Sequence, residues 1–205
     1  MGYTHYFGFK KNPADIENGE LKFINAVAMF REGLKKLPDL KLCGGLGKGE
    51  PIINDKEVCF NGDASTGEEY ETFRISFAND GEGFDDFCKT ARQPYDVAVC
   101  LALLCFEEAF GDDFEYSSDG YCPHDRQVID GKVELEEGWA KANEIMTAIN
   151  GDTPHTDVVE YTQRYGYDAL GHAIVKMIGE GDFNPDWEFA RKLWEYDGVA
   201  CKPNN

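Results

Sequence analysis

Apolar residues recur at two different spacings in the first part of the chain, and together the spacings predict a mixed α+β fold. A strand is predicted over 3–9, where every second residue is aromatic or histidine: Tyr3, His5, Phe7 and Phe9. A helix is predicted over 23–37, where apolar residues recur every three or four positions: Phe23, Val27, Phe30, Leu34 and Leu37. This helix ends before Pro38.

The next part of the chain has the pattern of short strands joined by turns. Strands are predicted at 40–43, 51–54, 57–60 and 71–77, with turn residues such as Asn61-Gly62-Asp63 between them. An acidic loop is predicted at 79–86. We therefore expect an antiparallel meander.

A second helix is predicted over 97–110, because this run is apolar nearly all round and must be buried on most sides. Pro94 suits its first turn, and Asp96 favours the positive end of the helix. A strand at 114–117 follows and ends at Asp119-Gly120.

From Tyr121 onward the pattern is helical, with apolar stripes that include Trp139, Ala142, Met146 and Ile149, then Leu170, Ile174 and Met177, and finally Trp187, Ala190 and Trp194. The prediction is an antiparallel sheet of about four to six strands, packed by the helices at 23–37 and 97–110, with a helical C-terminal portion. We expect an α+β core at 1–120, a helical insertion or extension at 121–182, and a C-terminal helix at 183–205 that packs on the core.

Charge narrows the classes of partner. The chain has 39 acidic and 20 basic residues and a net charge of −19, which repels nucleic-acid backbones and disfavours direct nucleic-acid binding. An acidic surface could instead imitate nucleic acid and occupy a basic protein partner. The simpler interpretation is that the acids cover solvated faces.

Cysteine usage and hydropathy suggest a cytoplasmic protein with reduced thiols. Seven cysteines are an odd number in a chain too long for a small disulfide scaffold. No signal-peptide pattern opens the sequence, and the longest apolar run, 97–106, is far shorter than the about 20 residues that span a bilayer. We therefore expect no membrane association.

One stretch, FCKTARQPYD at 87–96, points toward binding chemistry. It places Lys89 and Arg92 just before a buried helix, whose unpaired N–H groups and positive dipole end favour an anion. If this segment is helical, the two cations share a face. His5, Asn61, Asp63 and Asp119 would complete a pocket only if their segments gather beside it. Alternatively, the cations pair with Asp85, Asp86 or Asp96 and hold the helix entry.

Three other sequence patterns suggest a functional site but lack the residue spacing or the environment that its chemistry requires. The glycines at 44–49 do not form a phosphate loop, because Leu42 and Gly49 stand where Gly and Ser or Thr are needed. Cys122-Pro123-His124-Asp125 lacks a second pair of ligands for zinc. Cys88, with His5 as base, is the one candidate nucleophile, but a structural thiol is favoured. We predict no catalytic residue, no metal and no cofactor.

Four segments form a recurring set: MGYTHY at the start, GKGEPIINDKEVCFNGD at 47–63, FCKTARQPYD at 87–96 and SSDG at 117–120. The set resembles small uncharacterised proteins of tailed bacteriophages and prophages that open with MGYTHYW or a close variant. The likeness covers about the first 120 residues, although Phe7 stands where the relatives have Trp. It implies a phage-associated α+β protein, located in the host cytoplasm if phage-encoded, and it implies no activity.

The sequence thus favours a non-catalytic, phage-associated accessory protein that binds a host or phage protein, with its acidic surface as the candidate contact. One alternative is a pocket protein or enzyme that acts on an anionic small molecule at Lys89 and Arg92. Another is a structural component of an oligomer. If Lys89 and Arg92 form ion pairs within the chain, a structural role is favoured over a ligand site.

Overall fold

The computed structural model describes residues 2–78, 86–123, 127–129 and 132–151, and every structural statement below refers to these residues. Met1–Thr147 form one compact unit and Ala148–Asn205 a second. The predicted helices at 170–177 and after 183 lie outside the described residues. The predicted boundaries at 120 and 182 stay predictions.

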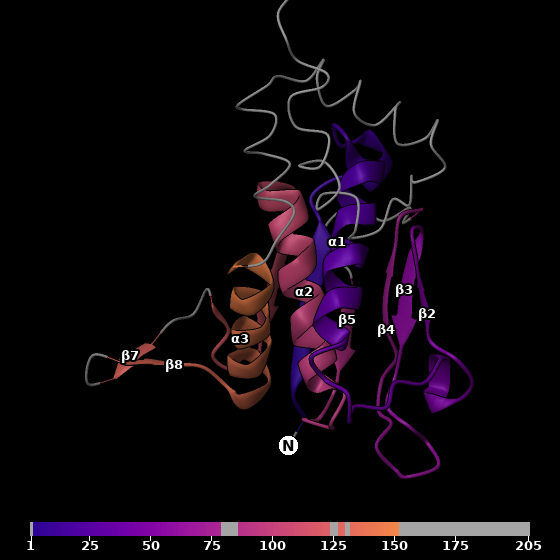
Figure 1. The fold of residues 1–205 in the computed structure, drawn as a ribbon, viewed down its shortest axis with the longest axis vertical. Coiled ribbons are helices and arrows are strands. Elements are labelled where there is room, and N and C mark those ends of the chain that lie inside the picture. The colour runs from indigo at the N-terminus through magenta and orange to yellow at the C-terminus, as the bar shows by residue number, and fades with distance from the viewer. Residues whose placement is uncertain (1, 79–85, 124–126, 130–131, 152–205) are drawn as a thin grey trace, which may run out of the picture. The chain divides into compact units, whose positions relative to one another are not determined.

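The described strands form two three-stranded antiparallel sheets and one hairpin (Figure 1). In the first sheet, β1 (Thr4–Phe9) lies between β5 (Asp86–Lys89) and β6 (Phe114–Ser118). In the second sheet, β3 (Glu57–Phe60) lies between β2 (Ile52–Asn54) and β4 (Phe73–Ser76). The hairpin pairs β7 (Gln127–Ile129) with β8 (Lys132–Glu134).

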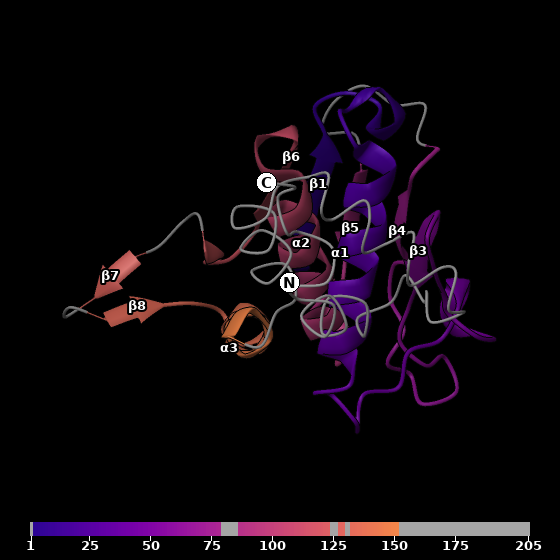
Figure 2. The same ribbon diagram turned by 45° about the horizontal axis from the view of Figure 1, so that its top comes forward.

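Three α-helices accompany the sheets: α1 (Gly19–Leu34), α2 (Asp96–Phe110) and α3 (Glu137–Gly151). α1 and α2 lie side by side in both views (Figures 1 and 2). They approach closely at Gly33, where a Cβ atom would come within 2.6 Å of the Leu101 side chain. Short 3-10 turns occur at Pro13–Asp15, Gly45–Gly47 and Gly111–Asp113.

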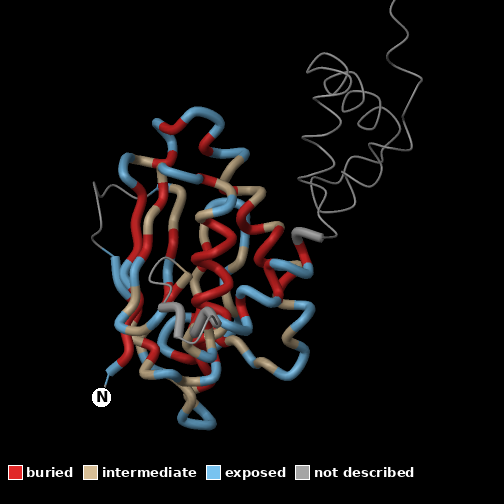
Figure 3. Tube along the Cα trace, turned by 90° about the vertical axis from the view of Figure 1, so that its left-hand side faces the viewer, coloured by how far each residue is buried: buried red, intermediate tan, exposed pale blue. Residues whose placement is uncertain are grey.

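Aromatic rings join the helices to the inner faces of the sheets. Phe106 on α2 contacts Phe9 and Phe114 of the first sheet and Phe23 of α1. Phe60 of the second sheet stacks on Phe30 of α1 at 5.6 Å between centroids. Figure 3 shows the buried residues along the packed helices and strands, while the exposed residues gather in turns.

The structure confirms the α+β class and the antiparallel pairing, and it corrects several details. The strands divide between two three-stranded sheets rather than forming one sheet of four to six strands. The antiparallel meander predicted after the first helix is confirmed as β2-β3-β4, while 40–43 contributes only an isolated bridge between Cys43 and Asn61. The chain after Tyr121 begins with the β7–β8 hairpin instead of a helix; Asp130-Gly131, a turn-forming pair, stands between its strands in the sequence. No helix in the described part of the chain has the length and apolar character to cross a bilayer.

We expect Phe106→Ala to lower the free energy of unfolding by about 3–5 kcal/mol, because it removes a fully buried ring that joins both helices to the first sheet. Leu21→Ala is the matched control, since Leu21 is a helical residue that is 57% exposed, and it should cost less than about 1 kcal/mol. Urea denaturation measures both. Equal effects of the two substitutions would show that Phe106 does not connect the layers.

Candidate functional site

The stretch 87–96 is a strand followed by a tight loop and a helix start, so its two cations do not share a helical face. Lys89 is the last residue of β5, and Ala91 and Arg92 have φ angles of 50° and 59°, in the left-handed region. The loop is fixed to the first strand, because the N–H groups of Thr90 and Ala91 both donate to the Tyr3 carbonyl, at 2.9 and 3.2 Å. The shared face on which the anion-site prediction depended is therefore absent from this segment.

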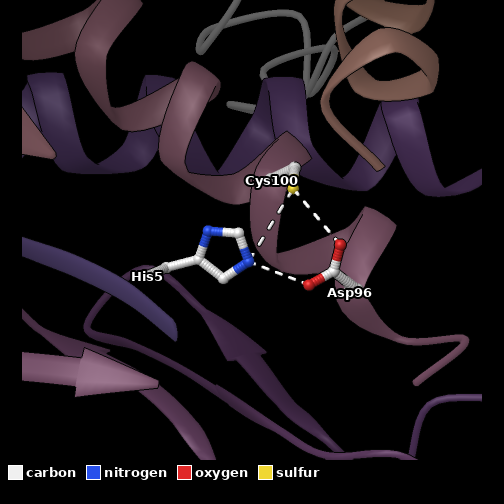
Figure 4. Close-up of side chains that lie close together, drawn as sticks. All are labelled: His5, Asp96 and Cys100. Atoms are coloured by element: carbon white, nitrogen blue, oxygen red, sulfur yellow. Dashed lines mark hydrogen bonds and ion pairs between the residues drawn. The ribbon is translucent and has the colours of Figure 1, made fainter. Parts of the chain in front are cut away.

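Beneath this loop, one buried carboxylate gathers several polar side chains. His5 Nε2 lies 2.9 Å from Asp96 Oδ1, which also accepts a hydrogen bond from the Thr90 hydroxyl. The Cys100 thiol, one helical turn after Asp96, donates to Oδ2 at 3.8 Å (Figure 4). His5 is completely buried, and Asp96 is 7% exposed. We call Thr90, Asp96, Cys100 and His5 the Asp96 cluster.

The cluster continues through the second nitrogen of His5. Ser118 Oγ at the end of β6 lies 3.2 Å from His5 Nδ1, and Trp139 Nε1 donates to Ser118 Oγ at 3.4 Å. If the His5 proton is on Nε2, each residue donates a hydrogen bond to the next: Trp139 to Ser118, Ser118 to His5 and His5 to Asp96. Polar contacts therefore connect β1, β6, α2 and α3.

A glycine lets α3 approach the same carboxylate. Gly138 lies in the first turn of α3, and a Cβ atom there would come within 2.3 Å of Asp96 Oδ2 and 3.3 Å of Cys100 Sγ. Asp96 also belongs to the first turn of α2. The positive ends of two helices thus lie beside one negative charge, which stabilises it.

The thiols near this cluster are not activated. Burial, followed by the charge of Asp96, raises the pKa of Cys100 well above its usual value. Burial also raises the pKa of Cys88, whose Sγ lies 3.5 Å from the Glu71 carbonyl. Because a thiolate is the nucleophile, these shifts argue against cysteine catalysis at either position. The structural interpretation of Cys88 fits this environment.

The two cations at the helix entry have different surroundings. Arg92 lies over the Tyr3 ring, 4.1 Å from its centroid, and pairs with Glu136 at 3.4 Å. Lys89 Nζ lies 6.0 Å from the centroid of Tyr70, and no carboxylate of the described residues pairs with it. Arg92 therefore has the partners of an architectural residue, whereas the half-buried Lys89 packs beside Gly2 and Tyr70.

The other predicted site residues divide between two places. Asp119 lies beside His5 at the same end of the first sheet, since its Oδ2 accepts from Thr4 N at 3.0 Å. Asn61 instead binds the backbone of Tyr70 and its neighbour Gly62, and Asp63 binds Lys41 and Ser65. All of these bonds are internal to the chain. Anion binding by the six predicted residues stays a prediction.

Sequence reasoning missed most of the Asp96 cluster. It assigned Asp96 only to the helix dipole and Cys100 to the apolar core, and it singled out neither Thr90 nor Ser118. The available signal was the position of Asp96 and Cys100 four residues apart on one helix face. Cys122 is buried, whereas His124 and Asp125 lie outside the described residues.

Asp96→Ala should lower the free energy of unfolding by about 3–5 kcal/mol, because it leaves the buried donors of His5 and Thr90 without an acceptor. Asp112→Ala removes an exposed carboxylate and should change the free energy by less than about 0.5 kcal/mol. Chemical denaturation followed by circular dichroism tests both. Near-equal stability of the two variants would contradict the stabilising role of the cluster.

Asp63 predicts a pH dependence of stability. Hydrogen bonds from Lys41 and then Ser65 lower the pKa of Asp63 from 3.8 to about 2 in the folded protein. A carboxyl group whose pKa is lower when folded stabilises the fold at a pH above its unfolded pKa, and this contribution is lost as the pH falls from about 4 to about 2. The stability difference between the natural chain and Asp63→Asn should shrink over that interval in thermal denaturation. A difference that stays constant would refute the assignment.

Comparison of this chain with family models, with curated proteins and with solved structures finds no match.

Proposed function

We propose that this protein is a non-catalytic binding protein that holds a protein partner on the outer face of the β5-β1-β6 sheet. The observation that carries the proposal is an aromatic pair on that face. Tyr6 and Phe87 are directly opposite each other on β1 and β5, and they are 42% and 57% exposed. Large adjacent aromatic side chains at a surface are typical of protein interfaces.

Strand alternation explains why the pair points outward. His5 and Phe7 are almost completely buried on the inner side, so Tyr6 between them projects to the opposite side. On β5 the small Cys88 is buried, while Phe87 is exposed. Opposite residues of antiparallel strands have Cβ atoms about 4.5–5.5 Å apart, so the two rings offer one continuous apolar surface.

A cation flanks this aromatic pair. Lys89 is two residues after Phe87 on β5 and therefore projects to the same side of the sheet. Its ammonium group also lies near the ring of Tyr70, which is 47% exposed. The combination fits a partner segment that presents an apolar side chain next to a carboxylate.

The interior supports a binding role over a catalytic one. His5 is fully buried, and both of its ring nitrogens have hydrogen-bonding partners within the chain. Burial also keeps the nearby Cys100 thiol protonated. A general base or nucleophile must reach its substrate, and these groups contact only other residues of the fold.

In this proposal the acidic composition attracts the partner from a distance, before the local contact forms. A net charge of −19 keeps copies of the chain apart and steers a partner that is basic overall. The local contact then involves the aromatic pair and Lys89. The resemblance to phage proteins favours a host or phage protein as the partner.

Paired substitutions test the sheet face. Tyr6→Ser with Phe87→Ser should abolish co-purification of a partner from infected-host lysate, because the double variant removes the apolar contact. Ile52→Ser with Leu21→Ser is the matched control, since those side chains are also 42% and 57% exposed but lie on β2 and α1. The control should retain the partner, and circular dichroism should show that both variants fold.

A charge reversal separates the role of Lys89 from a general effect of charge. Lys89→Glu should weaken capture at least about tenfold, the size expected for loss of a contacting ion pair together with the repulsion that replaces it. Lys48→Glu makes the same change at an exposed loop lysine and should leave capture unchanged. Capture that survives the aromatic double variant, or no specific capture by the natural chain, would overturn the proposal.

A further inference from the structure

The Asp96 cluster contains three different donor atoms that can bind a metal ion. His5 Nε2, a carboxylate oxygen of Asp96 and Cys100 Sγ all lie within 4.8 Å of one another, and the three residues are buried. Nε2 is 2.9 Å from Oδ1, Sγ is 3.8 Å from Oδ2, and Sγ is 4.0 Å from Nε2 (Figure 4). The nitrogen and the sulfur contact different oxygens of the same carboxylate.

We propose that His5, Asp96 and Cys100 form a binding site for one divalent transition-metal ion, with zinc as the best chemical fit. Zinc bonds of about 2.0–2.3 Å in a tetrahedron place neighbouring donors about 3.3–3.6 Å apart, which lies within the observed range. A mixed set of nitrogen, oxygen and sulfur donors suits zinc, whereas magnesium and calcium take oxygen donors.

The donors are carried by regular secondary structure. Asp96 and Cys100 are four residues apart on α2 and therefore lie on one face of the helix. His5 approaches from the middle strand of the first sheet, across the packed interface between β1 and α2. Only small side-chain movements are needed to place all three donors around an ion.

Each of two ligands already has an outer partner of the kind found at metal sites. Ser118 Oγ lies 3.2 Å from His5 Nδ1, so it can accept a hydrogen bond from Nδ1–H when Nε2 binds the metal. The Thr90 hydroxyl donates to Asp96 Oδ1 and fixes the carboxylate. Such outer contacts orient the ligands and hold the histidine in the required tautomer.

Charge balance also favours a divalent ion. In the observed arrangement the Cys100 thiol carries its proton and donates it to Asp96 Oδ2. A bound ion stabilises the thiolate, and the carboxylate and thiolate together neutralise its two positive charges. In this step the metal–sulfur bond replaces the S–H bond and one proton leaves to solvent, while the histidine proton moves from Nε2 to Nδ1.

Three protein ligands leave a fourth position. Among the described residues, buried Cys122 does not belong to the group of donor atoms that lie within 4.8 Å of one another, so water would be the fourth ligand. A Cys122→Ser variant should therefore leave the sulfur-to-metal charge-transfer intensity unchanged.

Cobalt(II) titration of the reduced, metal-free protein tests the site directly. We expect one ion per chain, a thiolate-to-cobalt band in the near ultraviolet, visible bands of a tetrahedral ion, and displacement by one equivalent of zinc. Binding at neutral pH in weak buffer should release one proton per ion. A natural chain without a thiolate band, or with a stoichiometry well below one, would overturn the proposal.

Two buried cysteines on α2 provide a matched comparison. Cys100→Ala should abolish the thiolate band, whereas Cys105→Ala should retain it, because Cys105 is equally buried but its Sγ contacts Met146. If Cys100→Ala fails to fold, Ser118→Ala keeps all three ligands and should weaken binding about 10- to 100-fold through the lost outer contact. A Ser118→Ala affinity equal to that of the natural chain would contradict the arrangement, as would a band that persists in Cys100→Ala.

The metal site and the sheet-face interaction can fail separately. Tyr6 and Phe87 project to the side of the sheet opposite His5, so their double serine variant should bind cobalt like the natural chain. Loss of partner capture with an unchanged cobalt spectrum would support both proposals.

Discussion

The buried carboxylate of Asp96 is the interaction on which the arrangement of the first sheet and the helices depends. It binds a histidine of β1, a threonine of the preceding loop and a cysteine in the next turn of its own helix. Gly138 brings the start of α3 against the same group. A buried charge is costly unless donors surround it, so the carboxylate stabilises only the arrangement that brings all of these elements together.

The strained loop before α2 follows from this constraint. Thr90 must reach Asp96 while its N–H group, and that of Ala91, bind the Tyr3 carbonyl. Two consecutive non-glycine residues, Ala91 and Arg92, then adopt left-handed angles, which cost free energy for residues with a Cβ atom. The cost is offset by the contacts made on either side of the turn, and the position of Arg92 over Tyr3 is one of them. The cation that suggested an anion site is thus part of the loop's own packing.

Local periodicity predicted the elements, whereas contacts between distant residues decided the site. The strand at β1 and the helices α1 and α2 were predictable because their patterns extend over many residues. β5 was missed because its pattern is inverted: the large Phe87 is exposed and the small Cys88 is buried. The bond between His5 and Asp96 joins residues 91 positions apart, and no spacing rule connects them. The sequence therefore drew attention to the stretch 87–96 through Lys89 and Arg92, whereas the structure gathers the buried hydrogen bonds of this stretch at Asp96.

The two sides of the first sheet have opposite chemistry, and this separation is the basis for assigning them different roles. Alternation along β1 sends His5 inward to polar partners in an apolar core and sends Tyr6 outward as an exposed aromatic. Folding alone favours apolar side chains at buried positions and polar side chains at exposed positions. The buried polar network and the exposed aromatic pair both depart from this preference. Because these departures lie on opposite faces of β1, only one residue apart, the proposed binding face and the proposed metal site can be altered independently of each other.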